Sequence, residues 1–391
     1  MKKLYLIFLL NCMALYINAN TRFGISHGPY LQEVDNNSAT VVFLTSRKGF
    51  SWVEVKKHGK PESEIKRFYS SKDGLIDAYN ITNVIRLYGL DHNKSYDYRI
   101  VSKEIKSFRP YKVTYGDSIA TEWYTMSTVN PDKKGGSVFI TSDMHGDDKK
   151  LEKLLVNADY KTCDAFFYAG DMMNYIDRFD TPFKSFIDKS VELFATSIPF
   201  EIVRGNHETR GKLARTYSDY FPKKDNKIYG SYLLGDIMIV MLDTGEDKSD
   251  DHPVYAGLAD YDGYRTEQAE WLKELVSSAE YNNAKYHIVI SHFPMVMDDI
   301  YKKENLWYGW EDAINKFLPI LNDANVDLLV SGHTHRYFYH KENPGENSFP
   351  IIEQGANSAT RLDIEDGKIS IKVVDTDGKA LNNSVIDIPR R

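Results

Sequence analysis

The stretch VDLLVSGHTH, residues 326–335, joins a largely apolar run to two histidines that are separated by one residue. Val326 to Val330 has the composition of a buried strand, and such a strand places His333 and His335 just beyond its carboxyl end. In open α/β sheets, ligands collect outside the carboxyl ends of the strands. The stretch therefore predicts a layered α/β fold in which both imidazoles face one binding site.

Four other apolar runs in the second part of the chain are followed by similar polar groups. These groups are Ser142-Asp143-Met144-His145, Gly170-Asp171-Met172-Met173-Asn174, Arg204-Gly205-Asn206-His207-Glu208 and Ser291-His292. Burying so many polar side chains together is costly unless a charged centre satisfies them. Imidazole suits Zn, Fe and Mn, and a carboxylate can bridge two ions about 3.5–4 Å apart. The set predicts two metal ions, with Asp171 as the bridge.

The ordered series of motifs resembles the calcineurin-like metallophosphoesterase superfamily. A strand-rich region before it makes the chain most similar to the purple acid phosphatase branch. The resemblance implies two divalent ions, Fe, Mn or Zn, and one ligand set for each. The implied ligands of the first ion are Asp143, His145, Asp171 and His335. The implied ligands of the second ion are Asp171, Asn206, His292 and His333, with His207 facing the substrate.

The chain departs from the purple branch at two of these motifs. Its first motif is Asp143-Met144-His145, where that branch has DxG, so His145 restores a ligand of the wider superfamily. The second motif of the branch is GDxxY, and Asn174 stands here at the tyrosine position, with Tyr175 one residue late. We therefore expect no tyrosinate-ligated ferric iron.

The expected chemistry is hydrolysis of a phosphate ester. Two ions lower the pKa of a shared water toward about 7, so that a metal-bound hydroxide attacks phosphorus in line. His207 is placed to protonate the leaving alkoxide or to hold the phosphate. Asn174 is a candidate to orient His207 or contact the phosphate. Arg204 is a candidate phosphate contact, although an arginine at a strand end is as often part of a surface ion pair.

The first part of the chain has a different texture. Residues 22–128 contain short β-type runs separated by turn signals, which predicts an all-β sandwich. Leu90 to Arg99 resembles the corner of a fibronectin type III domain. Residues 129–136 are predicted to be a linker, and residues 137–391 a metallophosphoesterase domain with a layered β-sandwich flanked by helices.

The first residues are typical of a secretory signal peptide. Met1-Lys2-Lys3 precedes the apolar run Leu4 to Leu10, and Ala19 is a suitable cleavage position, so residues 1–19 are expected to be removed. The protein would then be secreted or periplasmic, without a transmembrane helix. A surface lipoprotein anchored at Cys12 is a minor alternative, because Asn11 stands where a small residue is expected.

Composition narrows the possible partners. The 391 residues include 42% hydrophobic and 27% charged residues, and the net charge of −7 disfavours nucleic-acid binding by a basic surface. The favoured function is a secreted phosphomonoesterase, acid phosphatase-like, acting on a small-molecule phosphate ester. A phosphodiesterase or nucleotide pyrophosphatase on the same centre is the alternative, and a catalytically inactive surface-binding protein is less favoured. The oligomeric state is not determined by these patterns.

Overall fold

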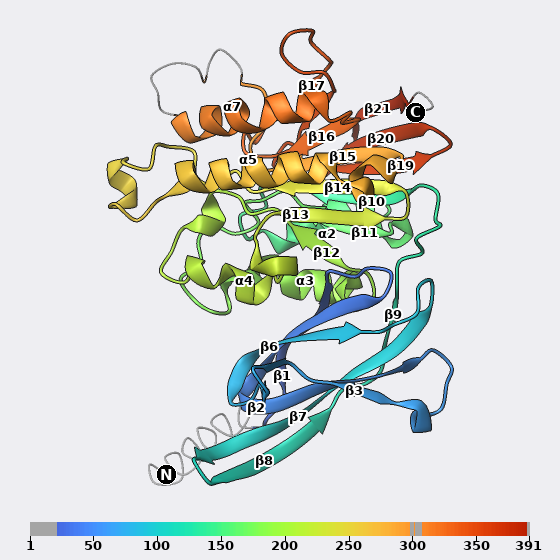
Figure 1. Cartoon of the computed structure of the whole chain (residues 1–391), viewed down its shortest axis with the longest axis vertical. Coiled ribbons are helices and arrows are strands. Elements are labelled where there is room, and N and C mark those ends of the chain that lie inside the picture. Colours follow the sequence, from blue (N-terminus) through green and yellow to red (C-terminus); the bar gives the residue numbers. More distant parts are fainter. Residues whose placement is uncertain (1–21, 298–300, 302–306, 389–391) are drawn as a thin grey trace, which may run out of the picture.

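The structure is a computed structural model that describes residues 22–297, 301 and 307–388. The predicted signal peptide, residues 1–19, lies outside the described residues. No helix within the described part of the chain is long and apolar enough to cross a membrane. Figure 1 shows an all-β region at one end of the molecule and an α/β body at the other.

The N-terminal region is built from strands alone, apart from the short helical turn Glu62–Glu64. Its strands are β1 (Ile25–Gln32), β2 (Ser38–Lys57), β3 (Lys66–Phe68), β4 (Ser71–Lys72), β5 (Leu75–Ile76), β6 (Asn80–Tyr88), β7 (Ser95–Arg109), β8 (Lys112–Ala120) and β9 (Tyr124–Ser127). The long strand β2 pairs with β1 and β6 along its first half and with β3 and β7 along its second half. All except the β4–β5 hairpin thus belong to one strongly bent, hydrogen-bonded sheet.

The body contains two six-stranded sheets. The first has the order β12-β11-β10-β19-β20-β21 and the second β13-β14-β15-β16-β18-β17. Strands of the first sheet are β10 (Gly136–Thr141), β11 (Ala165–Tyr168), β12 (Phe200–Ile202), β19 (Ser358–Glu365), β20 (Lys368–Asp375) and β21 (Ala380–Asp387). Strands of the second are β13 (Gly230–Leu234), β14 (Ile237–Leu242), β15 (Tyr286–Ser291), β16 (Leu328–Ser331), β17 (Phe338–His340) and β18 (Ile351–Glu353).

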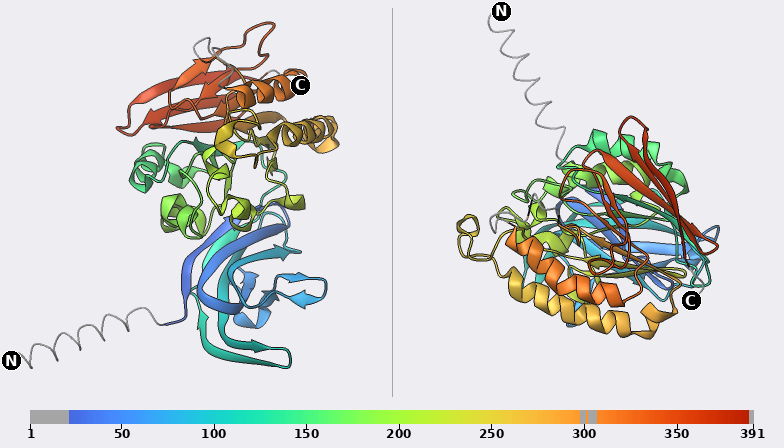
Figure 2. Two further views of the ribbon diagram at one scale, coloured as in Figure 1. Left: turned by 90° about the vertical axis from the view of Figure 1, so that its left-hand side faces the viewer. Right: turned by 90° about the horizontal axis from the view of Figure 1, so that it is seen from above.

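Helices cover the outer faces of both sheets. The helices are α2 (Asp148–Asn157), α3 (Asp188–Ser190), α4 (Tyr217–Tyr220), α5 (Tyr261–Ser277), α6 (Ala279–Asn283) and α7 (Tyr308–Asp323). Short turns of 3-10 or wider type lie at Tyr160–Thr162, Phe183–Ile187, Val191–Ala195, His207–Thr209, Ala214–Thr216, Lys224–Asn226 and Pro253–Tyr255. The two views of Figure 2 show α5 and α7 side by side over the second sheet.

Successive side chains of each strand point to opposite faces of its sheet, and this alternation creates the layers. In β10, Val138 and Ile140 face the core between the two sheets, whereas Phe139 faces the helical layer that contains α2. In β14, Ile239 faces the inter-sheet core and Val240 faces α5 and α7. Because strand side chains alternate, each of these fully apolar strands separates two cores. The expected α/β fold with layered sheets and flanking helices is confirmed.

The N-terminal region packs directly on the body. Tyr30 is fully buried in the core that contains α2, and its hydroxyl donates a hydrogen bond of 2.7 Å to the carbonyl of Tyr220. The hydroxyl of Tyr98 donates in the same way to Thr196. At the predicted fibronectin-like corner, the amide of Asp91 donates to the hydroxyl of Tyr96. The predicted domain boundaries and the likeness to fibronectin type III stay predictions.

Candidate metal centre

The loops after five strands bring the predicted ligands to one edge of the body. Strands β10, β11 and β12 are parallel neighbours in the first sheet, and β15 and β16 are parallel neighbours in the second. Their carboxyl ends meet, because the two sheets pack face to face. The resulting site contains Asp143, His145, Asp171, Asn174, Asn206, His207, His292, His333 and His335.

Five of these residues have a left-handed backbone. The φ angles are +57° for Asp143, +50° for His145, +54° for Asp171, +76° for His333 and +59° for His335. Non-glycine residues rarely adopt this region, which costs on the order of 1–3 kcal/mol for each residue. Such strain persists where the surrounding structure holds it, and five of the seven predicted ligands carry it.

Two glycines allow the loops to approach the carboxylates. A Cβ atom on Gly205 would lie 2.2 Å from Asp171 Oδ1, and one on Gly332 would lie 2.5 Å from Asp143 Oδ2. Both distances are far shorter than a nonbonded contact. A side chain at either position would therefore push the loop away from the site.

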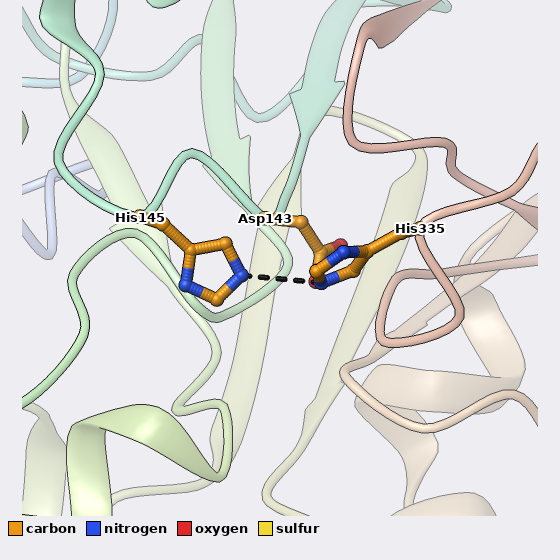
Figure 3. Close-up of side chains that lie close together, drawn as sticks. All are labelled: Asp143, His145 and His335. Carbon is orange, nitrogen blue, oxygen red and sulfur yellow. Dashed lines mark hydrogen bonds and ion pairs between the residues drawn. The ribbon is translucent and has the colours of Figure 1, made fainter.

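Asp143, His145 and His335 form one group of converging donor atoms (Figure 3). The Nε2 atoms of the two histidines are 3.1 Å apart, and His335 Nε2 is 3.3 Å from Asp143 Oδ1. Asp143 itself is fully buried. Three ligand atoms of the kinds that bind transition metals thus face one another, two from the loop after β10 and one from the loop after β16.

Asp171 joins this group to the remaining residues. Its Oδ2 atom lies 3.2 Å from His292 Nε2, 3.9 Å from His207 Nε2 and 4.0 Å from His145 Nε2. Two further groups of candidate ligand atoms contain Asp171, one with His145 and His207 and the other with Asp143 and His292. The sequence predicted Asp171 as the bridging carboxylate; its central position fits that role, which stays a prediction.

Asn206 and His333 lie on the side of His292. The Oδ1 atom of Asn206 is 3.1 Å from His292 Nε2. The ring of His333 is 5.2 Å from that of His292 between centroids, and it packs against Phe293 and Trp310. His333 belongs to none of the candidate groups found among the described residues, although its amide donates to Asp143 Oδ2.

Backbone carbonyls orient two of the imidazoles. His292 Nδ1 donates a hydrogen bond of 2.8 Å to the carbonyl of Ala169, which leaves Nε2 facing Asp171. His207 Nδ1 donates in the same way to the carbonyl of Asn174. The amide side chain of Asn174 donates to the carbonyl of His145. Hydrogen bonds of this kind select the tautomer and direction of a metal-binding or catalytic histidine.

The charges in the site shift one another's pKa values. Burial would raise the pKa of Asp171, but His292 and the amide of His207 outweigh it and hold the pKa well below its usual range. Burial likewise would lower the pKa of His292, but Asp171 raises it. Burial lowers the pKa of His333 to about 3 and lowers that of His145. His333 and His145 are therefore neutral near pH 7, the form in which imidazole binds a metal, whereas the charge of Asp171 favours the protonated form of His292.

The donor set fits metal ions. Two carboxylates, four imidazoles and one amide oxygen are the ligand types of Zn, Mn and Fe centres. Asp143 Oδ1 and His145 Nδ1 are buried and make no hydrogen bond within the described part of the chain. An unsatisfied carboxylate oxygen beside two converging imidazoles is stable when a cation lies among them.

Sequence reasoning assigned no role to Glu208, which follows His207 directly. This buried carboxylate accepts hydrogen bonds from the amides of Asp171, Met173 and Gly205 at 2.9, 3.2 and 2.8 Å. Burial first, and then the charge of Asp171, raise its pKa to about 7. Glu208 ties two ligand loops together. Its only sequence signal was its place within the same motif.

The geometry does not support the expectation that Arg204 contacts a phosphate. Its guanidinium makes a 2.7 Å ion pair with buried Asp243 and lies among the rings of three tyrosines, Tyr217, Tyr261 and Tyr264. Arg210 is instead the arginine at the site, with Nη1 3.1 Å from His207 Nε2. A basic residue one helical turn after His207 was the signal that could have pointed to it.

Comparison with known proteins identifies the family of this fold and site. The sequence pattern described as calcineurin-like phosphoesterase matches residues 136–337, more than half of the chain. The chain belongs to the calcineurin-like phosphoesterase family. It is a metal-dependent phosphoester hydrolase, and its family uses a dinuclear divalent metal centre. No curated protein sequence matches the chain.

One solved structure shares the architecture over most of the chain. Purple acid phosphatase PPD1 from yellow lupin (Lupinus luteus) seeds superposes with a TM-score of 0.69 at 13% identity, covering 92% of this chain and 74% of that chain. The phosphopantetheinyl hydrolase PptH from Mycobacterium tuberculosis gives a TM-score of 0.40 at 14% identity, covering 57% of this chain and 90% of that chain. At these identities the likeness to the lupin enzyme shows the fold alone, including the all-β region before the body.

Proposed function

We propose that the protein is an exported phosphomonoesterase that hydrolyses a small-molecule phosphate ester at a dinuclear centre. The observation that carries the choice of a monoester is Arg210, whose guanidinium reaches the predicted substrate side of the site beside His207. A phosphomonoester is a dianion near neutral pH, so it gains more than a monoanionic diester from a fixed guanidinium. Export rests on residues 1–19, which lie outside the described residues.

The proposed ligands are those that the sequence resemblance implies, and three of them, Asp143, His145 and His335, also form one of the groups described above. Asp143, His145, Asp171 and His335 hold one ion, and Asp171, Asn206, His292 and His333 hold the other. The ions are Fe, Mn or Zn, because imidazole and carboxylate are mixed in both sets. When bound, such a pair supplies a water of lowered pKa and polarises the phosphoryl oxygens.

His207 is proposed to be the catalytic acid. Its Nδ1 atom is anchored by the carbonyl of Asn174, so Nε2 is the nitrogen that faces Asp171 and Arg210. Nε2 accepts from Arg210 Nη1 in this geometry. Once the guanidinium turns to the phosphate, Nε2 can carry the proton that an alkoxide leaving from the same side takes up. The role of Asn174 in this proposal is to position His207 through its backbone carbonyl. Its side chain positions His145.

A buried carboxylate holds Arg210 in place, so that its guanidinium can bind the phosphate. Glu246 is 3% exposed and accepts from Arg210 Nε at 3.2 Å and Nη2 at 3.1 Å. Thr209 and Tyr255 also donate to Glu246, which fixes the carboxylate. Because two nitrogens of the guanidinium are engaged, Nη1 is the edge directed toward His207. A fixed guanidinium of this kind loses little conformational entropy when it binds a phosphoryl oxygen.

The experiment compares a nitrophenyl phosphomonoester with the matching bis-nitrophenyl diester, using purified, metal-analysed protein with and without added Mn²⁺ or Zn²⁺. We expect a higher kcat/KM for the monoester. In Arg210→Gln, KM for the monoester should rise about tenfold, with a smaller change for the diester. Arg178→Gln is the matched control, because Arg178 is an exposed arginine paired with Asp180. Preference for the diester in the unmodified protein would favour a phosphodiesterase and contradict this proposal.

A further inference from the structure

Exposed aromatic side chains gather at the free tip of the β7–β8 hairpin. Phe108 is 52% exposed, and Tyr111, in the turn, is fully exposed. Tyr79, 42% exposed, comes from the segment before β6 and lies 5.6 Å from Phe108 between ring centroids. Figures 1 and 2 place this end of the N-terminal region opposite the end of the molecule that carries α5 and α7. Soluble proteins rarely expose a cluster of large apolar side chains, so such a cluster is a candidate interaction surface.

Cations surround these rings. The ammonium of Lys48 lies 4.2 Å from the centre of the Tyr79 ring. Arg109 and Lys112 pair across the hairpin directly beside Tyr111. Lys48, Arg109 and Lys112 form no ion pair with any acid in the described part of the chain. The tip, defined as Lys48, Tyr79, Phe108, Arg109, Tyr111 and Lys112, is therefore basic and aromatic, although the whole protein carries a net charge of −7.

The tip lies beside the point where the described chain begins. The carbonyl of Gly24 accepts from the amide of Ser46, and buried Phe23 packs against Gly49. The carbonyl of Gly49 in turn accepts from the amide of Tyr79. In the sequence, the apolar stretches Leu4 to Leu10 and Met13 to Ile17 end five residues before Arg22.

We propose that this tip is a docking surface for a membrane that contains anionic lipids. Aromatic rings favour the boundary between lipid headgroups and hydrocarbon, and exposed Lys and Arg are attracted to anionic headgroups. The acidic body does not oppose this contact, because charges more than about 8 Å from the surface are screened at physiological ionic strength. Lys48 already covers one face of Tyr79, and Tyr79 and Phe108 are tilted by 57°, so the rings form no flat platform for stacking a sugar.

Docking at this tip would position the hydrolase at the membrane through which it is exported. It needs no apolar anchor, since the rings and cations belong to residues 48–112. Alone, the tip is a single membrane signal, and a lipid on Cys12 would be a second one. A single weak membrane signal gives reversible binding, and two signals give stable attachment.

The test measures co-sedimentation of a chain that starts at residue 20 with lipid vesicles. This chain keeps the four packed cores within residues 22–388 and lacks the N-terminal apolar run. Vesicles of phosphatidylcholine are compared with vesicles containing about one third phosphatidylglycerol. We expect at least about tenfold stronger partitioning to the anionic vesicles, falling as salt is raised from about 0.05 to 0.5 M.

Two variants separate the aromatic and ionic contributions. Phe108→Ser with Tyr111→Ser should weaken partitioning about tenfold, and Lys48→Gln with Lys112→Gln should remove the preference for anionic vesicles. Val254→Ser with Leu258→Ser is the matched control, because these side chains are exposed apolar residues on the body. Hydrolysis of nitrophenyl phosphate by each variant reports whether the fold is intact. Absence of vesicle binding, equal binding to both vesicle types, or unchanged binding by the tip variants would overturn the proposal.

Discussion

The edge of the α/β body and the tip of the N-terminal hairpin contrast in how they hold polar side chains. At the edge, Asp143 and Asp171 are buried beside four imidazoles, and both aspartates have a left-handed backbone. At the tip, Lys48 and Arg109 extend from regular strand or hairpin backbone into solvent beside exposed rings. The edge concentrates charge in a protected place, whereas the tip presents charge to an outside surface.

The difference separates chemistry from attachment. Preorganised, buried charges act strongly because water does not screen them, and they require a supporting network such as Glu208. A single exposed charge contributes little, but several exposed charges together can attract the protein to a large surface of opposite charge. Changes at the edge should therefore alter turnover with little effect on association with membranes. Changes between the two regions should alter stability alone.

The largest effect is expected from Asp171→Asn. The amide keeps the shape of the side chain but removes the charge that lies within about 4 Å of three imidazoles. Both metals should bind more weakly, and turnover should fall more than about 10⁴-fold. Metal analysis of the dialysed protein and single-turnover assays measure this. Asp180→Asn, at a buried carboxylate paired with Arg178 and Lys184, is the control. Full metal content in Asp171→Asn would exclude the bridging role.

His207→Ala should keep both metals and lose most of the rate. Loss of a positioned acid costs roughly 10²–10⁴-fold when the leaving group needs a proton. The loss should be largest for an alkyl phosphate and small for nitrophenyl phosphate, whose leaving group is a weak base. Comparison of the two substrates in the variant measures the role directly. An equal loss on both substrates would instead indicate that His207 binds the phosphate.

Glu208→Gln tests the support of the ligand loops. Glutamine offers one oxygen where three amides now donate to two oxygens, so at least one buried amide is left unsatisfied. We expect a loss of about 1–3 kcal/mol in the free energy of unfolding and a 10–100-fold fall in metal affinity. Denaturant titration and competition with a chelator measure these. Glu192→Gln is the control: Glu192 is exposed, in the turn Val191–Ala195, and its substitution should change neither the free energy of unfolding nor the metal affinity.

The smallest effect on turnover is expected at the junction of the two regions, where a change should alter only the pH dependence of stability. Lys223 Nζ lies 2.7 Å from Glu201 and 3.9 Å from Glu33, so one buried cation serves two carboxyl groups. Burial, and then the charge of Glu201, raise the pKa of Glu33 from 4.5 to about 7. Between these pH values the folded state binds more protons than the unfolded state. The free energy of unfolding should therefore fall by up to about 3 kcal/mol as pH rises from 4.5 to 7.

Glu33→Gln should remove this pH dependence. The neutral amide resembles the protonated carboxyl, so the variant should match the unmodified protein near pH 4.5 and exceed its stability above pH 7. Thermal unfolding across this pH range, with metals removed, is the measurement. Glu122→Gln, at an exposed residue of the same N-terminal region, is the control. Turnover should change in neither variant, because Glu33 lies outside the site.

Prediction from the sequence succeeded where the signal was local. The apolar runs at β10, β11, β15 and β16 and the polar residues directly after them follow from strand periodicity and from the place of ligands in α/β folds. Which of the two arginines, Arg204 or Arg210, reaches the site depends on residues that are distant in the sequence. Asp243, which neutralises Arg204, and Glu246, which orients Arg210, are both more than 30 residues away in the sequence.

By itself, the sequence determined the fold class, the order of the motifs and the residue types at the candidate metal centre. These depend on contacts between neighbours along the chain and on alternation within each strand. The tertiary structure decided which groups contact one another: Glu208 contacts two ligand loops, Arg210 contacts His207, and Lys48 contacts the ring of Tyr79. Such pairings depend on how distant loops pack together, and residue spacing alone does not specify that packing.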